Sequence, residues 1–205
     1  MIEVELKAGL SLEAERRLRG KVQAMEFQGI VPCWDVYYDT GGLDLLQNAV
    51  FVRVRDNSQL QFKFNESADP AHVQSLERVF RLVPDQAQAE EMNALFARFL
   101  PFWHAAPDFE TARVTNRLIE LAHIRNRREV YTGNGIHLSI DHVEGLGDFL
   151  EVEVQCEERA EAEKAVAVLQ AFLAELDVQP LSVGYVELWL RVHNPQAYQL
   201  GRYHL

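Results

Sequence analysis

Short stretches in which apolar and polar residues alternate recur along the chain and predict β-strands. In residues 2–7, isoleucine, valine and leucine alternate with two glutamates and a lysine. A period of two is typical of a strand that buries one face and leaves the other polar. Further strands are predicted at 50–55, 60–65, 76–82, 136–141 and 149–155.

Helical patterns lie between these strands. Ser11 is placed to cap a helix that has acidic residues in its first turn and is predicted to run to about residue 27. Residues 85–108 are predicted to be helical with an aromatic end, residues 159–176 form a helix with an apolar stripe, and residues 181–192 are a last helix or strand. The pattern therefore predicts an α+β fold with about eight mostly antiparallel strands. It contains neither a dinucleotide-binding fingerprint nor a P-loop.

The amino-acid composition indicates the class of protein. The 205 residues are 48% hydrophobic and 25% charged, which suits a single domain over 1–205 with a substantial core. The net charge of −11 argues against binding of nucleic acid through its phosphates. We expect no membrane span and no signal peptide, because the apolar runs are short and the first residues are acidic. Two cysteines are too few for a disulfide framework, so a cytoplasmic location is expected.

The polar faces of the predicted strands carry charges in repeated patterns. Two strands contain Glu-x-Glu and one contains Arg-x-Arg. Residues two apart on a strand point the same way and lie about 6.6 Å apart, so each pattern places like charges side by side. The charged set consists of Glu3, Glu5, Lys7, Arg53, Arg55, Lys63, Glu77, Asp141, Glu151 and Glu153.

These charges have a chemical use if the faces turn inward in a closed barrel. Paired carboxylates repel unless a divalent cation such as Mg²⁺ or Mn²⁺ neutralises them. Arginine and lysine side chains in the same interior need an anion, and phosphate matches the geometry of guanidinium groups. A polyphosphate with a bound metal ion satisfies both requirements. The competing interpretation is a set of solvated strand faces with ordinary cross-strand ion pairs.

The ordered motifs resemble those of one family. The Glu-Val-Glu-Leu-Lys run at 3–7 resembles the Glu-x-Glu-x-Lys signature of the CYTH superfamily, the triphosphate tunnel metalloenzymes. Segments 35–40, 52–55, 62–64 and 141–153 are similar to later family segments in the same order. The Val-Glu-Gly-Leu-Gly run within the last segment resembles the subgroup of class IV adenylyl cyclases. Together these matches cover nearly the whole chain.

The resemblance implies a closed or nearly closed antiparallel barrel that forms a charged tunnel, with helices packed outside. It also implies Mg²⁺ or Mn²⁺ as cofactor and a role for each matching residue. The implied metal ligands are Glu3, Glu5, Asp141, Glu151 and Glu153. The implied substrate-binding residues are Lys7, Arg53, Arg55, Lys63, Glu77 and Arg128, and the implied catalytic residues are Glu5, Lys7, Arg55 and Glu153.

One position departs from the family pattern. The family has a basic pair on the strand before Asp141, and here the first member of the pair falls on Asn126. The family spacing favours Arg128 as the second member. Strict alternation instead groups Arg125 and Arg127 on the polar face, so these two arginines remain alternatives.

The resulting functional prediction is a class IV adenylyl cyclase-like enzyme that converts ATP to cyclic AMP and pyrophosphate. The first alternative is a phosphohydrolase acting on inorganic triphosphate, thiamine triphosphate or a nucleoside triphosphate. A non-catalytic polyphosphate- or nucleotide-binding module and a purely structural domain are further alternatives. The expected partner is a small-molecule triphosphate, with no nucleic acid and no membrane. Residues 96–103 are expected to cover the fold, with a homodimer contact as the alternative.

Overall fold

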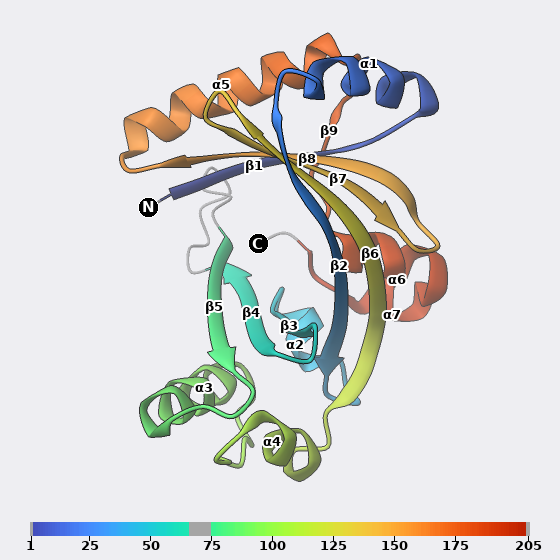
Figure 1. The fold of residues 1–205 in the computed structure, drawn as a ribbon. Helices are drawn as coiled ribbons and strands as arrows, with labels where there is room; N and C mark the ends of the chain where they lie inside the picture. The colour runs from blue at the N-terminus through green and yellow to red at the C-terminus, as the bar shows by residue number, and fades with distance from the viewer. Residues whose placement is uncertain (1, 66–74, 204–205) are drawn as a thin grey trace. The chain divides into compact units, whose positions relative to one another are not determined.

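The computed structural model describes residues 2–65 and 75–203 (Figure 1). Its strands are β1 (Ile2–Gly9), β2 (Glu26–Asp39), β3 (Phe51–Arg55), β4 (Gln59–Asn65), β5 (Ser75–Arg81), β6 (Ile119–Gly133), β7 (Ile136–Val143), β8 (Gly147–Cys156) and β9 (Pro180–Leu181). Its helices are α1 (Leu12–Val22), α2 (Asp44–Gln47), α3 (Gln86–Phe99), α4 (Phe109–Thr115), α5 (Arg159–Glu175), α6 (Tyr185–His193) and α7 (Pro195–Leu200). The predicted α+β class is confirmed. None of the described helices has the length and apolar character that crossing a membrane requires.

The strands form one antiparallel sheet in the order β5-β4-β3-β2-β6-β7-β8-β1-β9. Strands β5 and β9 are its edges, and no pairing joins them within the described ranges, so the sheet is open. The prediction of a closed or nearly closed barrel of about eight strands, with its enclosed tunnel, is therefore wrong. Strand β9 has only two residues, and its Pro180 has no backbone N–H to donate to a further strand.

The chain divides into two compact units, each built from separate segments. The first unit comprises Met1–Cys33 and Arg125–Ser182, and the second comprises Trp34–Ile124 and Val183–Leu205. Strands β2 and β6 contribute residues to both units. Each unit has its own hydrophobic core, and each is described separately below.

The core of the first unit lies between the sheet and two helices. The apolar faces of β1, β7 and β8 pack against α1 and α5. Helix α1 begins after Ser11, whose hydroxyl accepts a hydrogen bond from the Ala14 backbone N–H at 3.1 Å, as predicted. Fully buried side chains include Leu18, Leu138, Leu150, Val152, Leu169 and Leu173. Since the helices take up the apolar face, the charged residues of these strands lie on the opposite face.

The second unit has an aromatic core. Apolar residues of β3 and β4 pack against α3 and α4, and in β3 the buried valines alternate with half-exposed residues. The ring of Phe96 lies 4.6 Å from that of Phe62 and stacks on Trp103 at 3.9 Å. The Trp103 indole N–H donates to Asn93 Oδ1 at 2.9 Å. In this unit, residues 96–103 therefore contribute to the core that covers β3 and β4.

Two helix boundaries differ from the predicted ones. The first helix ends at Val22 rather than near residue 27, because the chain enters β2 at Glu26 and Phe27 packs its ring 5.2 Å from Tyr131. The helix predicted over 85–108 ends at Phe99 and is followed by a loop and by α4. The last apolar segment contains both β9 and α6. In each case tertiary packing outweighs the local pattern.

Candidate functional site

One face of the sheet in the first unit carries charged side chains from neighbouring strands. Strand register places Glu5 of β1 opposite Glu153 of β8, which in turn lies opposite His137 of β7. In the next row, Lys7 lies opposite Glu151. Cross-strand partners have Cβ atoms about 5 Å apart. Each row therefore brings its side chains close enough to interact.

An ion-pair network connects Lys7 and Glu151 to Arg128 of β6 and Asp141 of β7. Lys7 Nζ lies 2.8 Å from Glu151 Oε1 and 3.9 Å from Glu5 Oε1. Arg128 of β6 donates its Nε to Asp141 Oδ1 at 2.7 Å and its Nη2 to Asp141 Oδ2 at 2.6 Å. The same Nη2 also donates to Glu151 Oε2. Asp141 is fully buried, and the side chains of Lys7 and Glu151 are each only 13% exposed. The network thus compensates buried charge within this unit.

Two other carboxylates face each other with less compensation. Glu5 and Glu153 are directly opposite in the β1–β8 register, an arrangement that destabilises a sheet by like-charge repulsion. The Glu5 side chain is 33% exposed, and Glu153 Oε1 accepts a hydrogen bond from Gln155 Nε2 at 3.2 Å. The predicted ligand Glu3 pairs through its backbone with Gln155, while its side chain lies outside the described part of the structure.

The register also separates the three arginines of β6. Arg128 lies opposite Asp141 and points to the face that carries the ion-pair network. Arg127 lies on the other face, where it pairs with a glutamate of the same strand at 3.1 Å, and Arg125 shares that face by strand alternation. Asn126, two residues before Arg128, has a buried Oδ1 without a hydrogen-bond partner. Only Arg128 of the three therefore shares the face of the network.

The second unit has a separate group of cations on β3. Asp35 of β2 is buried and lies opposite Arg55, whose Nε and Nη2 both donate to its carboxylate at 2.8 Å. Arg53 Nη1 donates to the same carboxylate at 3.0 Å and to the Tyr37 hydroxyl at 3.2 Å. Arg53 Nε donates to Gln61 Oε1 at 2.7 Å. One carboxylate therefore holds two guanidinium groups on the same strand face.

The residues around Arg53 keep its guanidinium group protonated. Burial lowers the pKa of Arg53, but the nearby Tyr37, Asp35 and Glu77 together raise it, so the pKa lies above its ordinary value. Glu77 Oε1 of β5 lies 3.5 Å from Arg53 Nη2. Lys63 is exposed and lies opposite Glu77 in the β4–β5 register. These contacts give a face with three cations and two carboxylates.

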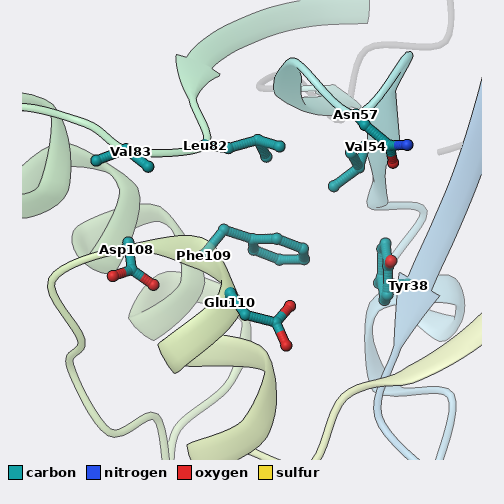
Figure 2. Close-up of a pocket in the computed structure, with 8 residues that line it drawn as sticks. All are labelled: Tyr38, Val54, Asn57, Leu82, Val83, Asp108, Phe109 and Glu110. Carbon is teal, nitrogen blue, oxygen red and sulfur yellow. The ribbon is translucent and has the colours of Figure 1, made fainter.

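A cavity of about 280 Å³ also lies in the second unit, but it is not part of this charged face (Figure 2). Its wall includes Tyr38 and Val54, which alternate with the residues of the charged face and therefore point to the other side of the sheet. Its two carboxylates are already used within the fold. Asp108 caps α4, and Glu110 pairs with Arg113 at 2.9 Å.

Comparison with known proteins places this chain in a family. The model of the CYTH domain matches residues 1–184. The chain belongs to the CYTH family. This family comprises triphosphate-acting enzymes that depend on a divalent metal, generally Mg²⁺ or Mn²⁺. No curated protein matches the chain.

Solved structures share the CYTH fold of this chain. The PH1819 protein from Pyrococcus horikoshii OT3 is 25% identical, with a TM-score of 0.63 over 92% of this chain and 98% of that one. An adenylyl cyclase candidate from Hippeastrum, described as having a dominant triphosphatase activity, is 20% identical, with a TM-score of 0.60 over 92% and 94%. An adenylate cyclase candidate from Vibrio parahaemolyticus is 14% identical, with a TM-score of 0.57 over 92% and 97%.

The donor chemistry of the first unit suits the metal that the CYTH family implies. Carboxylate oxygens are the ligands that Mg²⁺ and Mn²⁺ prefer. However, no group of three or more His, Cys, Asp or Glu side chains is close enough to hold a metal ion among the side chains that the structure describes. In the structure, Lys7 and Arg128 pair with Glu151, and Arg128 also pairs with Asp141.

The sequence prediction missed the residues that position the arginines of this CYTH protein. Asp35 and Gln61 were not among the predicted site residues, although they contact Arg53 or Arg55 directly. The available signal was their alternation on strands that neighbour the Arg-x-Arg strand. Alternation alone does not show which strands are neighbours, so the contacts appear only in the folded chain.

Proposed function

We propose that this CYTH protein is a divalent-metal-dependent enzyme that acts on a triphosphate-containing substrate, with ATP conversion to cyclic AMP and pyrophosphate as the first candidate reaction. The observation that carries the proposal is the pair of guanidinium groups of Arg53 and Arg55, held on one strand face by Asp35. Guanidinium groups bind phosphate oxygens in a bidentate manner, and a preorganised pair loses little side-chain entropy on binding.

Each charged residue receives a role in this proposal. Arg53, Arg55 and Lys63 bind phosphate oxygens, and Glu77 helps to orient Arg53. Lys7 and Arg128 of the first unit are also proposed to bind phosphate. The proposed metal ligands are Glu3, Glu5, Asp141, Glu151 and Glu153, and the proposed catalytic residues are Glu5, Lys7, Arg55 and Glu153.

In the cyclase reaction, the ribose 3′-oxygen loses its proton and attacks the α-phosphorus, and pyrophosphate leaves. The arginine and lysine side chains stabilise the negative charge that develops on the phosphate oxygens, which is the main electrostatic demand of phosphoryl transfer. A bound Mg²⁺ or Mn²⁺ supplies further neutralisation of these oxygens.

Triphosphate hydrolysis is the second candidate reaction, and the Hippeastrum protein described with a dominant triphosphatase activity favours it. Here water attacks the terminal phosphorus instead of a ribose oxygen attacking the α-phosphorus. Both reactions need the same positive charge around the phosphates, so the charged faces support either. The difference lies in which nucleophile is held in line with the phosphorus that reacts.

A substrate panel tests the proposal. Purified protein is incubated with ATP, inorganic triphosphate or thiamine triphosphate, each with Mg²⁺, Mn²⁺ or EDTA, and the products are separated by chromatography. Metal-dependent cyclic AMP with equimolar pyrophosphate supports the cyclase, whereas orthophosphate supports the triphosphatase. Binding of all three compounds without any product would instead indicate a non-catalytic polyphosphate-binding module and contradict the proposal.

A further inference from the structure

Glu151 is proposed as a metal ligand, yet the chain's own cations already surround it. Lys7 Nζ lies 2.8 Å from one of its oxygens, and Arg128 Nη2 donates to the other. Both carboxylate oxygens are therefore engaged on a side chain that is only 13% exposed. A metal ion and these two cations compete for the same oxygens, because each neutralises the same negative charge.

Arg128 is held in place independently of Glu151. Its Nε and Nη2 form a bidentate pair with the fully buried Asp141 at 2.7 and 2.6 Å. Arg128 can thus exchange its contact with Glu151 for a phosphate oxygen while Asp141 keeps the guanidinium oriented. The Lys7 ammonium also lies 3.9 Å from the carboxylate of Glu5 on the same strand.

We propose that Lys7 and Arg128 withhold Glu151 from divalent metal until a polyphosphate binds these two cations. This inference rests on the proposed function, and it adds that substrate and metal bind with positive coupling. Phosphate oxygens offer the cations a replacement for Glu151, which releases the carboxylate for the metal. Because coupling is reciprocal, the metal raises polyphosphate affinity by the same factor.

The proposal makes an unusual prediction for the protein without polyphosphate. Removal of the Lys7 charge should strengthen metal binding, although Lys7 is itself a proposed catalytic residue. A unit charge about 6 Å from a divalent ion in a water-like dielectric changes the affinity about tenfold. We therefore expect Lys7→Met to bind Mn²⁺ about tenfold more tightly than the wild type.

The experiment measures free Mn²⁺ by electron paramagnetic resonance during titration of the apoprotein, with no phosphate compound present. It compares the wild type, Lys7→Met, Glu151→Gln and the double variant. Lys21→Met is the matched control, because Lys21 also pairs with a glutamate, Glu175, in the same unit. The gain in Lys7→Met should disappear in the double variant, and the control should bind Mn²⁺ like the wild type.

Arg128→Lys tests the other cation that contacts Glu151, and it keeps a positive charge beside Asp141. A lysine lacks the fork that contacts both carboxylates, so Mn²⁺ affinity should rise here too. The inference is overturned if the wild type binds Mn²⁺ and the folded Lys7→Met and Arg128→Lys variants bind it no more tightly than the wild type. That result leaves the proposed function intact. Failure of the wild type and all variants to bind Mn²⁺ overturns both the inference and the metal dependence in the proposed function. An equal gain in Mn²⁺ affinity in Lys21→Met would show that the effect comes only from the change in net charge, and this result also overturns the inference.

Discussion

Replacement of Asp35 by asparagine should destabilise the protein and make its stability depend on anions. The buried Asp35 carboxylate accepts two hydrogen bonds from Arg55 at 2.8 Å and one from Arg53 at 3.0 Å. Asparagine keeps the size of the side chain but removes its charge. Two guanidinium groups on one strand face would then repel each other with little compensation.

The size of the effect follows from the burial of the three side chains. Loss of one partner from a buried ion pair costs about 3 kcal/mol or more. The side chains of Arg53 and Arg55 remain 18% and 28% exposed to water, which reduces the expected loss in unfolding free energy to roughly 2 kcal/mol. For a chain of this length, that corresponds to a fall in Tm of roughly 4–8 °C.

The assay is thermal and urea unfolding of wild type, Asp35→Asn and Asp108→Asn at equal ionic strength in chloride or sulfate. Asp108 caps α4, and asparagine caps helices as well as aspartate does, so this control undergoes the same substitution without loss of an ion pair. Sulfate stabilises proteins generally, but it should stabilise Asp35→Asn more than the control because it pairs with the freed arginines. Equal stability of the two variants, or equal gains in sulfate, would refute the reasoning.

Three further predictions concern single carboxylates or arginines. Arg55→Ala leaves Asp35 paired with one arginine, so we expect the unfolding free energy to fall by about 1 kcal/mol. The affinity for tripolyphosphate, measured by calorimetry, should fall at least about tenfold. Unchanged affinity would remove Arg55 from the site. Glu153→Gln relieves the repulsion with Glu5 and should raise the unfolding free energy of the metal-free protein by about 0.5 kcal/mol. Mn²⁺ should stabilise the wild type more than the variant. Equal stabilisation of the two proteins by Mn²⁺ would exclude Glu153 as a ligand. Burial raises the pKa of Asp39 to about 6, above its unfolded value of about 3.9, so the folded state binds more protons over this range. The unfolding free energy should therefore fall by about 2 kcal/mol between pH 4 and 6; an identical pH profile for Asp39→Asn in urea unfolding would contradict this.

The strand faces were predictable from the sequence because alternation reports burial directly. The valines of β3 are buried as predicted, and the structure places Arg53 and Arg55 on the opposite, polar face of this strand. The predicted start of the first helix at Ser11 is confirmed by its side-chain hydrogen bond. These features depend on local periodicity and capping, which need no knowledge of distant segments.

Closure of the sheet and the pairing of charges were not predictable in the same way. The alternation pattern is the same in an open sheet and in a closed barrel, because it reports faces and not the partner of an edge strand. The choice of Arg128 over Arg125 and Arg127 rests on family spacing, and its contact with Asp141 appears only in the folded chain. The occupation of Glu151 by Lys7 depends on the β1–β8 register, which joins segments more than a hundred residues apart.

We propose that this CYTH protein cleaves a triphosphate with the help of a divalent metal. The most direct measurement follows ATP and inorganic triphosphate by ³¹P nuclear magnetic resonance with wild-type protein and with Arg55→Ala. The assays contain Mg²⁺, Mn²⁺ or EDTA. We predict that at least one substrate is converted by the wild type with metal, that EDTA stops the reaction, and that Arg55→Ala slows it about a hundredfold or more. Unchanged phosphorus spectra for the wild type under all metal conditions, or equal turnover by the folded Arg55→Ala variant, would contradict the account.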